Sequence, residues 1–140
     1  MRKPAVVLAT ALLGLSLIAA AGAGATARAY LPGCGGSDHA RYKPTSVIVT
    51  CGDGGFRVAD LKWSAWTTTS GSGAGTAKVN TCTPTCAQGS FKSYPVKLTL
   101  TRPRACPVGK REFSRLKYAF PSKYPGGSKR SETLHRPCSK

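Results

Sequence analysis

Acidic residues are scarce in this sequence: Asp and Glu number 5 among 140 residues, against 21 Lys and Arg. Hydrolytic enzymes need a carboxylate pair, a nucleophile with a base, or a metal. Asp53 lies between glycines in a turn, and Asp60 has the outward parity of its strand, so neither resembles half of an acid–base pair. His39 and His135 are the only histidines. Because both fall in irregular terminal segments, we expect no catalytic residue unless a disulfide brings those segments together.

Motifs for catalysis and cofactor binding are also missing. The chain has no GxSxG elbow, no HExxH and no P-loop. Gly71, Gly73 and Gly75 form a GxGxG pattern, but it does not link a strand to a helix as dinucleotide-binding loops do. We expect it in a loop over residues 67–75, where alternate glycines would let Trp63 or Trp66 lie against bare backbone. The sequence predicts no cofactor.

Beyond residue 24 the chain lacks any apolar run of the ~20 residues that a membrane span needs. The run over residues 5–24 follows Arg2 and Lys3 and precedes Ala27-Arg28-Ala29, whose small residues suit a cut before Tyr30. This pattern is typical of a secretory signal peptide, residues 1–29, with a retained anchor as the alternative. Its removal would leave 111 of the 140 residues, which is one small domain.

Six cysteines in a short exported chain predict three disulfides and a secreted, extracellular protein. They are Cys34, Cys51, Cys82, Cys86, Cys106 and Cys138. We expect Cys34 to pair with Cys138, since both lie in irregular terminal segments; the other pairings stay open. The spacing of Cys82 and Cys86 would suit zinc, but the histidines are far away in sequence, so we expect no metal.

Cys34 has a second interpretation, because the residues 31–34 loosely resemble a lipobox in which the cysteine carries lipid. Arg28 interrupts the approach from the apolar run, and Pro32 is unusual in that position. Lipidation would also leave an odd number of cysteines. We therefore favour a disulfide for Cys34.

Short β-branched and alternating segments, with no helical period, predict an all-β fold. A hairpin over residues 47–63 turns at Gly52-Asp53-Gly54-Gly55, because Asp-Gly favours positive φ. Further strands are expected at residues 76–80, 94–100 and 113–120. The result would be a small disulfide-stapled sandwich or barrel of about five strands at residues 46–120. An irregular N-terminal arm, residues 30–45, and a basic C-terminal tail, residues 121–140, would flank it.

The two tryptophans are candidates for a stacking platform or for core. Their three-residue spacing puts Trp63 and Trp66 on opposite faces of a regular strand, unless the strand bends at Ser64-Ala65. We expect Trp63 in the core and leave the exposure of Trp66 open.

Positive charge is concentrated in the second half of the chain. The formal net charge is +16, of which Lys92 to Lys140 contributes +11. Such asymmetry predicts an anionic partner. If strands 94–100 and 113–120 pair with apolar faces inward, their outward cations form one surface. The candidate anion-binding residues on this surface and at its ends are Lys78, Lys97, Arg102, Arg104, Lys110, Arg111, Arg115 and Lys117.

One set of motifs resembles a family of small exported actinobacterial proteins that has no assigned function. The motifs are Cys51-Gly-Asp-Gly-Gly55, Leu61-Lys-Trp63, Trp66, Asn80-Thr-Cys82-Thr-Pro84-Thr-Cys86-Ala-Gln-Gly89 and Tyr94-Pro-Val96. The resemblance covers residues 46–120, and it implies export and disulfide bonding but no catalytic or binding residue.

The function expected from these features is electrostatic binding of an anionic cell-surface or extracellular polymer, or a membrane surface, by a non-enzymatic monomer. Sequence-specific nucleic-acid binding is not expected, because no nucleic-acid motif is present. One alternative is a secreted inhibitor of another protein, such as a protease, which would offer the loop 81–88 or 102–110, with Arg104 or Lys110 suiting a trypsin-like pocket. Another alternative is a cationic antimicrobial factor.

Overall fold

One mixed sheet of seven strands makes up the fold, in the order β1-β6-β5-β4-β3-β2, with β7 also paired to β6. The computed structural model describes residues 27–126 and 128–139, and this part contains no helix. The strands are β1 (Ala29–Tyr30), β2 (Val47–Ile48), β3 (Phe56–Trp66), β4 (Ser70–Asn80), β5 (Phe91–Ala105), β6 (Arg111–Ala119) and β7 (Ser131–His135). No helix of the described chain is therefore long and apolar enough to cross a membrane.

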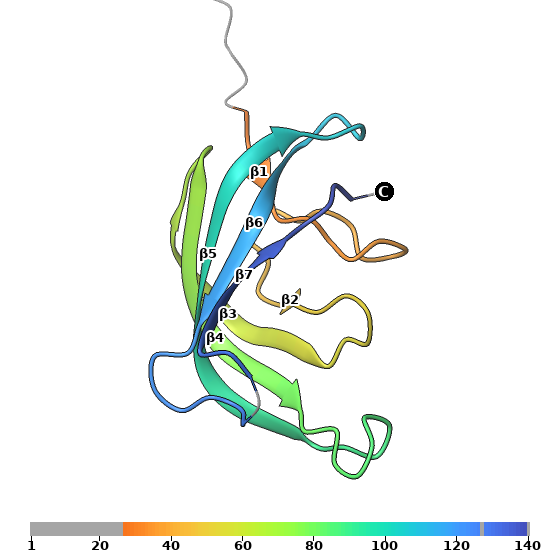
Figure 1. The fold of residues 1–140 in the computed structure, drawn as a ribbon. Coiled ribbons are helices and arrows are strands. Elements are labelled where there is room, and N and C mark those ends of the chain that lie inside the picture. The colour runs from red at the N-terminus through yellow and green to blue at the C-terminus, as the bar shows by residue number, and fades with distance from the viewer. Residues whose placement is uncertain (1–26, 127, 140) are drawn as a thin grey trace, which may run out of the picture.

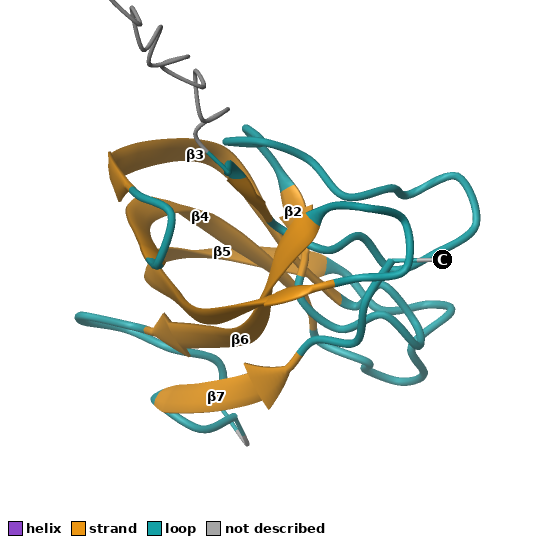
Figure 2. Ribbon diagram, turned by 90° about the horizontal axis from the view of Figure 1, so that it is seen from above, coloured by secondary structure: helices purple, strands orange, loops and turns teal. Residues whose placement is uncertain are grey.

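The sheet curls strongly, so that its long strands form a half-barrel around the core (Figure 1). Seen from above, β3 to β7 follow an arc, and most of the longer loops lie on one side of it (Figure 2). The predicted all-β, disulfide-stapled fold is confirmed. A single curled sheet takes the place of two stacked sheets, with neighbouring strands antiparallel except where β1 runs parallel to β6.

Strands β5 and β6 supply the centre of the core through strict alternation. Val96, Leu98 and Leu100 are almost fully buried, and Leu98 and Leu100 lie opposite Tyr118 and Leu116 of β6. Burying each such side chain contributes about 1.5–3 kcal/mol. The residues between them point to the opposite face, so the predicted pairing of these two strands with their apolar faces inward is confirmed.

The glycine-rich segment is a strand from Ser70 onward, so the loop predicted over residues 67–75 is wrong for most of its length. A Cβ added to Gly73 would lie 2.8 Å from Trp63, and one added to Gly71 would lie 3.3 Å from Trp66. The prediction that tryptophan covers bare backbone is confirmed. The low intrinsic strand propensity of glycine is overridden because the indole rings fill the space that side chains would occupy.

Both tryptophans lie on the same side of β3, because the register shifts between Trp63 and Ala65. This bulge is the bend that the sequence left open, and it brings the two rings to 4.5 Å between centroids. Each ring is half-buried against the core. Trp63 Nε1 donates to the carbonyl of Pro44 at 2.9 Å, and Trp66 Nε1 donates to that of Ala29 at 3.0 Å. The two side chains thus join the N-terminal segment to the sheet.

The predicted hairpin is present, with β2 antiparallel to β3, although its first strand is reduced to Val47–Ile48. In its turn Asp53 Oδ1 accepts hydrogen bonds from Gly55 N at 2.8 Å and Thr50 Oγ1 at 3.2 Å. These bonds lower the pKa of Asp53, and Gly54 adopts a φ of 64°. Asp53 is therefore occupied in shaping the turn.

The three disulfides join Cys34 to Cys51, Cys82 to Cys86, and Cys106 to Cys138. The predicted Cys34–Cys138 pairing is wrong. The C-terminal segment is not irregular throughout: β7 pairs with β6 and leads Cys138 to Cys106, beside the turn between β5 and β6. The sulfur of Cys34 is used within the fold, which is incompatible with lipidation in this arrangement.

The N-terminal segment packs into the sheet as well. Ala29 and Leu31 are 1% and 2% exposed, and Leu31 forms a bridge with Arg41. Ala29 pairs with Arg111 of β6. The predicted signal peptide falls mostly on residues 1–26, outside the described residues, but its last residue, Ala29, is part of β1.

A chain that begins at Tyr30 is expected to be less stable than one that begins at Ala27, by about 1–2 kcal/mol. The shorter chain loses a buried alanine, its pairing with β6 and the acceptor of the Trp66 indole. Urea unfolding of both chains with disulfides intact measures the difference. Equal midpoints and slopes would show that β1 contributes nothing.

Candidate anion-binding face

The outer surface of the sheet carries a cluster of cations on β3, β5 and β6, which we call the outer face: Lys62, Lys97, Arg115 and Lys117. All four are exposed. Lys62 and Lys97 share one row, with Ala74 between them, and Lys117 lies opposite Thr99 in the next row. Arg115 lies opposite Thr101 one row further on. The expectation that Lys97, Thr99, Arg115 and Lys117 share one face is confirmed.

Strand geometry sets the spacing of these charges. Diagonal neighbours such as Lys97 and Lys117 are about 7–8 Å apart at Cα, and residues two apart along a strand are about 7 Å apart. Two like charges at about 8 Å repel by roughly 0.5 kcal/mol in water. Among the described residues, the salt bridges join Arg41 to Asp38 and Lys129 to Glu132, so the outer face receives no such compensation. An anionic partner would remove this repulsion.

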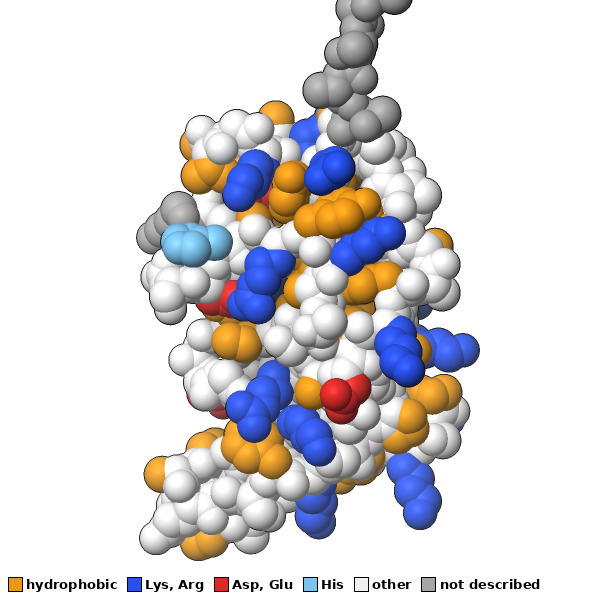
Figure 3. Space-filling view, turned by 180° about the vertical axis from the view of Figure 1, so that it is seen from behind, with side chains coloured by type: hydrophobic (Ala, Val, Ile, Leu, Met, Phe, Trp, Pro, Cys, Tyr) orange, Lys and Arg blue, Asp and Glu red, His pale blue; other side chains and the backbone are white. Residues whose placement is uncertain are grey.

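Small hydroxyl residues separate the cations. Ser72, Thr99, Lys117 and Thr133 form one row across four strands. Hydroxyl groups donate to anionic oxygens as readily as to water. Viewed from behind, Lys and Arg side chains are spread over the length of the molecule, with few acidic side chains among them (Figure 3).

Lys78 joins the sheet as predicted and lies on the same surface as Lys97, two rows beyond it along β4 and β5. It pairs with Ser93 of β5, and its Nζ donates to the Ser93 hydroxyl at 2.8 Å. Arg57 of β3 is its other neighbour and stacks over Phe91 at 4.9 Å from the ring centroid. These two cations form a separate pair near the end of the sheet.

Four predicted residues lie around the turn between β5 and β6, and they differ in availability. Arg104 is half-buried and turns inward, where its Nη2 donates to the carbonyl of Arg136 at 3.0 Å. Lys110 lies over the Tyr30 ring at 5.3 Å. Arg102 and Arg111 are exposed. The guanidinium of Arg104 thus holds the C-terminal segment and is not free to bind an anion on the surface.

Two cations of the sheet were missed by sequence reasoning, Lys62 and Arg57. Both lie on β3, in the half of the chain whose net charge is low, so a count of charge along the chain does not single them out. The alternation along β3 could have identified them as outward-facing. Arg57 lies between buried Phe56 and Val58, and Lys62 follows buried Leu61. The bulge between Ala59 and Lys62 obscured this alternation.

The carboxylates are used locally rather than gathered into a site. Asp38 binds Arg41 and accepts from Cys34 N at 2.9 Å; burial opposes ionisation, but these two partners lower its pKa overall. Buried Glu112 accepts from Ser139 N at 2.8 Å. Glu132 binds Lys129 and the Tyr118 hydroxyl. Burial, with Glu132 adding to it, raises the pKa of Tyr118 to about 12. Asp60 is exposed at the β3 bulge.

A possible metal grouping among the described residues consists of Cys106, Glu112 and Cys138, whose ligand atoms lie within 4.8 Å of one another. Its two sulfurs are joined in a disulfide, and a disulfide sulfur does not bind a metal as a thiolate does. These residues therefore do not form a usable metal site in the oxidised protein.

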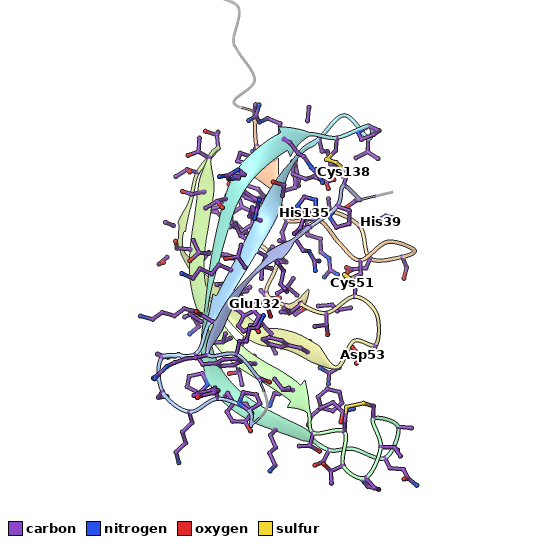
Figure 4. The ribbon with its side chains drawn as sticks, in the orientation of Figure 1. His39, Cys51, Asp53, Glu132, His135 and Cys138 are labelled. Carbon is purple, nitrogen blue, oxygen red and sulfur yellow. A yellow bond between two sulfur atoms is a disulfide. The ribbon has the colours of Figure 1, made fainter. Side chains whose placement is uncertain are left out.

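A cavity of about 500 Å³ opens on the loop-covered side of the sheet. Its walls come from the N-terminal arm, the turn after β2, and the end of β7 with the segment that follows, including Cys34, Cys51, His135, Arg136 and Cys138. His39 and His135 both lie on this side of the molecule (Figure 4), but only His135 lines the cavity. The structure has no Cys34–Cys138 bridge, so that bridge does not bring His39 and His135 together in one site.

Comparison with known proteins adds no assignment: no family model, no curated protein and no solved structure matches this chain. The resemblance to small exported actinobacterial proteins stays a prediction.

Proposed function

We propose that this is a secreted, non-enzymatic protein that binds an anionic polymer of the cell surface or extracellular space through the outer face. Three disulfides are consistent with an extracellular protein. The observation that carries the proposal is the outer face itself, where four exposed cations on three strands of one sheet lack carboxylate partners among the described residues.

The binding is sequence-blind and electrostatic. A flexible chain with regularly spaced phosphates can follow the rows of the sheet, contacting cations directly and hydroxyl groups between them. The curled sheet presents the outer face as an open surface, so the affinity depends on several weak contacts made together. Such binding weakens steeply as salt rises, because each neutralised phosphate releases a counterion.

The test compares two triple variants of the whole protein. Lys97→Glu, Arg115→Glu and Lys117→Glu reverse the outer face, whereas Lys43→Glu, Lys92→Glu and Lys123→Glu make the same charge change elsewhere. Lys92 has the inward parity of β5, and Lys43 and Lys123 lie in loops. Binding is measured to cell-wall preparations and to long-chain polyphosphate over a range of salt.

The outer-face variant is expected to lose at least about tenfold in affinity, and to reduce the log–log salt slope by about 2–3 for polyphosphate. The affinity of the control variant should fall less, since its substitutions change the net charge of the protein but not the charges of the outer face. Equal losses in the two variants, or wild-type binding that ignores salt, would contradict the proposal.

A second candidate, a protein inhibitor, has partial support from one loop. Cys82–Cys86 closes a short exposed loop after β4, which is a rigid shape that a protease could recognise. The other loop is weakened as a candidate, because residues 102–105 are part of β5 and Arg104 is turned inward. Stoichiometric inhibition of trypsin or subtilisin would favour this alternative, whereas killing of neighbouring cells would favour an antimicrobial factor.

A further inference from the structure

The Cys34–Cys51 disulfide lies beside a buried positive charge. Arg136 is 3% exposed, and its Nη1 lies 3.3 Å from Cys51 Sγ while its Nη2 lies 3.8 Å from Cys34 Sγ. The same guanidinium donates to the carbonyls of Pro32, Ile48 and Val49, which fix its position. A cation held against both sulfurs stabilises whichever of them becomes a thiolate.

The disulfide is also reachable from outside. Cys51 is exposed and Cys34 is half-exposed. Both line the cavity of about 500 Å³, and Gly33, Gly35 and Gly36 form its wall near Cys34. Figure 4 shows Cys51 on the loop-covered side of the sheet. Access and charge therefore coincide at one disulfide.

The Cys106–Cys138 disulfide has an acidic rather than a basic neighbour, although Cys138 lines the same cavity. Cys106 is 7% exposed, and a carboxylate oxygen of buried Glu112 lies within 4.8 Å of both sulfurs. An acidic side chain beside these sulfurs offers a thiolate no positive partner. The two disulfides thus differ in the charged side chain that lies beside their sulfurs.

We propose that Cys34–Cys51 is a redox-active site that oxidises accessible dithiols, such as a reduced cysteine pair in a peptide, by thiol–disulfide exchange. A partner thiolate attacks exposed Cys51 Sγ and forms a mixed disulfide, and the Sγ–Sγ electron pair leaves with Cys34, beside Arg136. The second partner thiol loses its proton and attacks the mixed disulfide. Cys51 leaves as a thiolate and takes up a proton. The partner gains a disulfide, and two electrons pass to Cys34 and Cys51.

Other charged groups near this pair were weighed against Arg136. Asp38 acts in the opposite direction, but it binds the backbone N of Cys34 and shares its charge with Arg41. Asp53 is exposed in the turn after Cys51, so solvent screens it. His135 lines the same cavity. Arg136 is the charge in direct contact with sulfur, and its effect therefore dominates.

The first test mixes the oxidised full chain with a synthetic peptide carrying two reduced cysteines, without oxygen, followed by acid quench and mass mapping. The wild type is expected to oxidise the peptide with reduction of Cys34–Cys51 alone. The C34S/C51S variant should fall to the background rate while the other two disulfides stay intact. Exchange at the wild-type rate in C34S/C51S would overturn the proposal, because it would place the reaction at one of the other two disulfides.

The second test measures the pH dependence of alkylation of the reduced pair in the wild-type chain, so its main readout needs no variant. The midpoint in the native chain is expected at least about one pH unit below that in urea. R136K should keep the low midpoint and R136Q should lose it, with each variant checked for folding by near-ultraviolet circular dichroism. A native midpoint equal to or above the urea value would overturn the proposal.

Discussion

Replacing Arg136 with methionine is expected to lower the free energy of unfolding by about 3–5 kcal/mol. The guanidinium is almost completely buried and donates to the carbonyls of Pro32, Ile48 and Val49 at 3.0–3.2 Å. Methionine has a similar length but donates nothing, so three buried carbonyls lose a partner at about 1–3 kcal/mol each. Removing a buried cation offsets part of that loss, because burial lowers the pKa of Arg136 even though Asp38 opposes the shift.

Urea unfolding at neutral pH with the disulfides intact measures this change. Arg130 is the matched control, since it also donates to two backbone carbonyls, those of Phe120 and Pro121, but is exposed. Arg130→Met should cost less than about 1 kcal/mol. If Arg136→Met were as stable as the wild type, the free-energy cost of burying the charge would equal the stabilisation from its hydrogen bonds. The contacts of Arg136 with Pro32, Ile48 and Val49 would then add no net stability.

Gly73→Ala is expected to destabilise the protein by about 2–3 kcal/mol, although alanine is ordinarily no worse than glycine in a strand. The added Cβ would lie 2.8 Å from the backbone oxygen of Lys62 and 2.8 Å from the Trp63 ring. Backbone cannot move aside cheaply within a paired sheet, and Trp63 is held by its hydrogen bond to Pro44. The indole would have to leave its place in the core.

A graded series makes this result specific. Gly71→Ala should cost less, about 1 kcal/mol, because its Cβ would approach only side-chain atoms at 3.3 Å. Ser72→Ala, whose side chain has outward parity between the two glycines, should change stability by less than about 0.5 kcal/mol. Thermal or urea unfolding ranks the three variants. A Gly73→Ala protein at least as stable as Ser72→Ala would show that Trp63 does not require bare backbone.

Much of the fold was predictable because strand parity is a local property. The alternation of Val96, Lys97 and Leu98 is visible in the sequence and fixes which residues face outward. The sequence alone therefore places Lys97, Arg115 and Lys117 on one face. Asp53 was likewise predictable, because an Asp between glycines bonds its own turn.

The remaining features depend on contacts between distant segments. The pairing of Cys138 with Cys106 follows from β7 joining β6, and the polar segment after Pro121 gave no sign of a strand. Glycines formed β4 because Trp63 and Trp66 cover them, and a bulge in β3 placed both rings on one side. Buried Arg136 resembles any other cation of a basic tail until its carbonyl partners from residues 32–49 are known.

The most direct test of the proposed function is to map by NMR which backbone amides shift when long-chain polyphosphate is added at low salt. The account predicts that the largest shifts follow the outer face, at Lys62, Lys97, Thr99, Arg115 and Lys117, and that they disappear as salt is raised. Shifts concentrated at the loop closed by Cys82 and Cys86, or in the cavity beside Arg136, would contradict it.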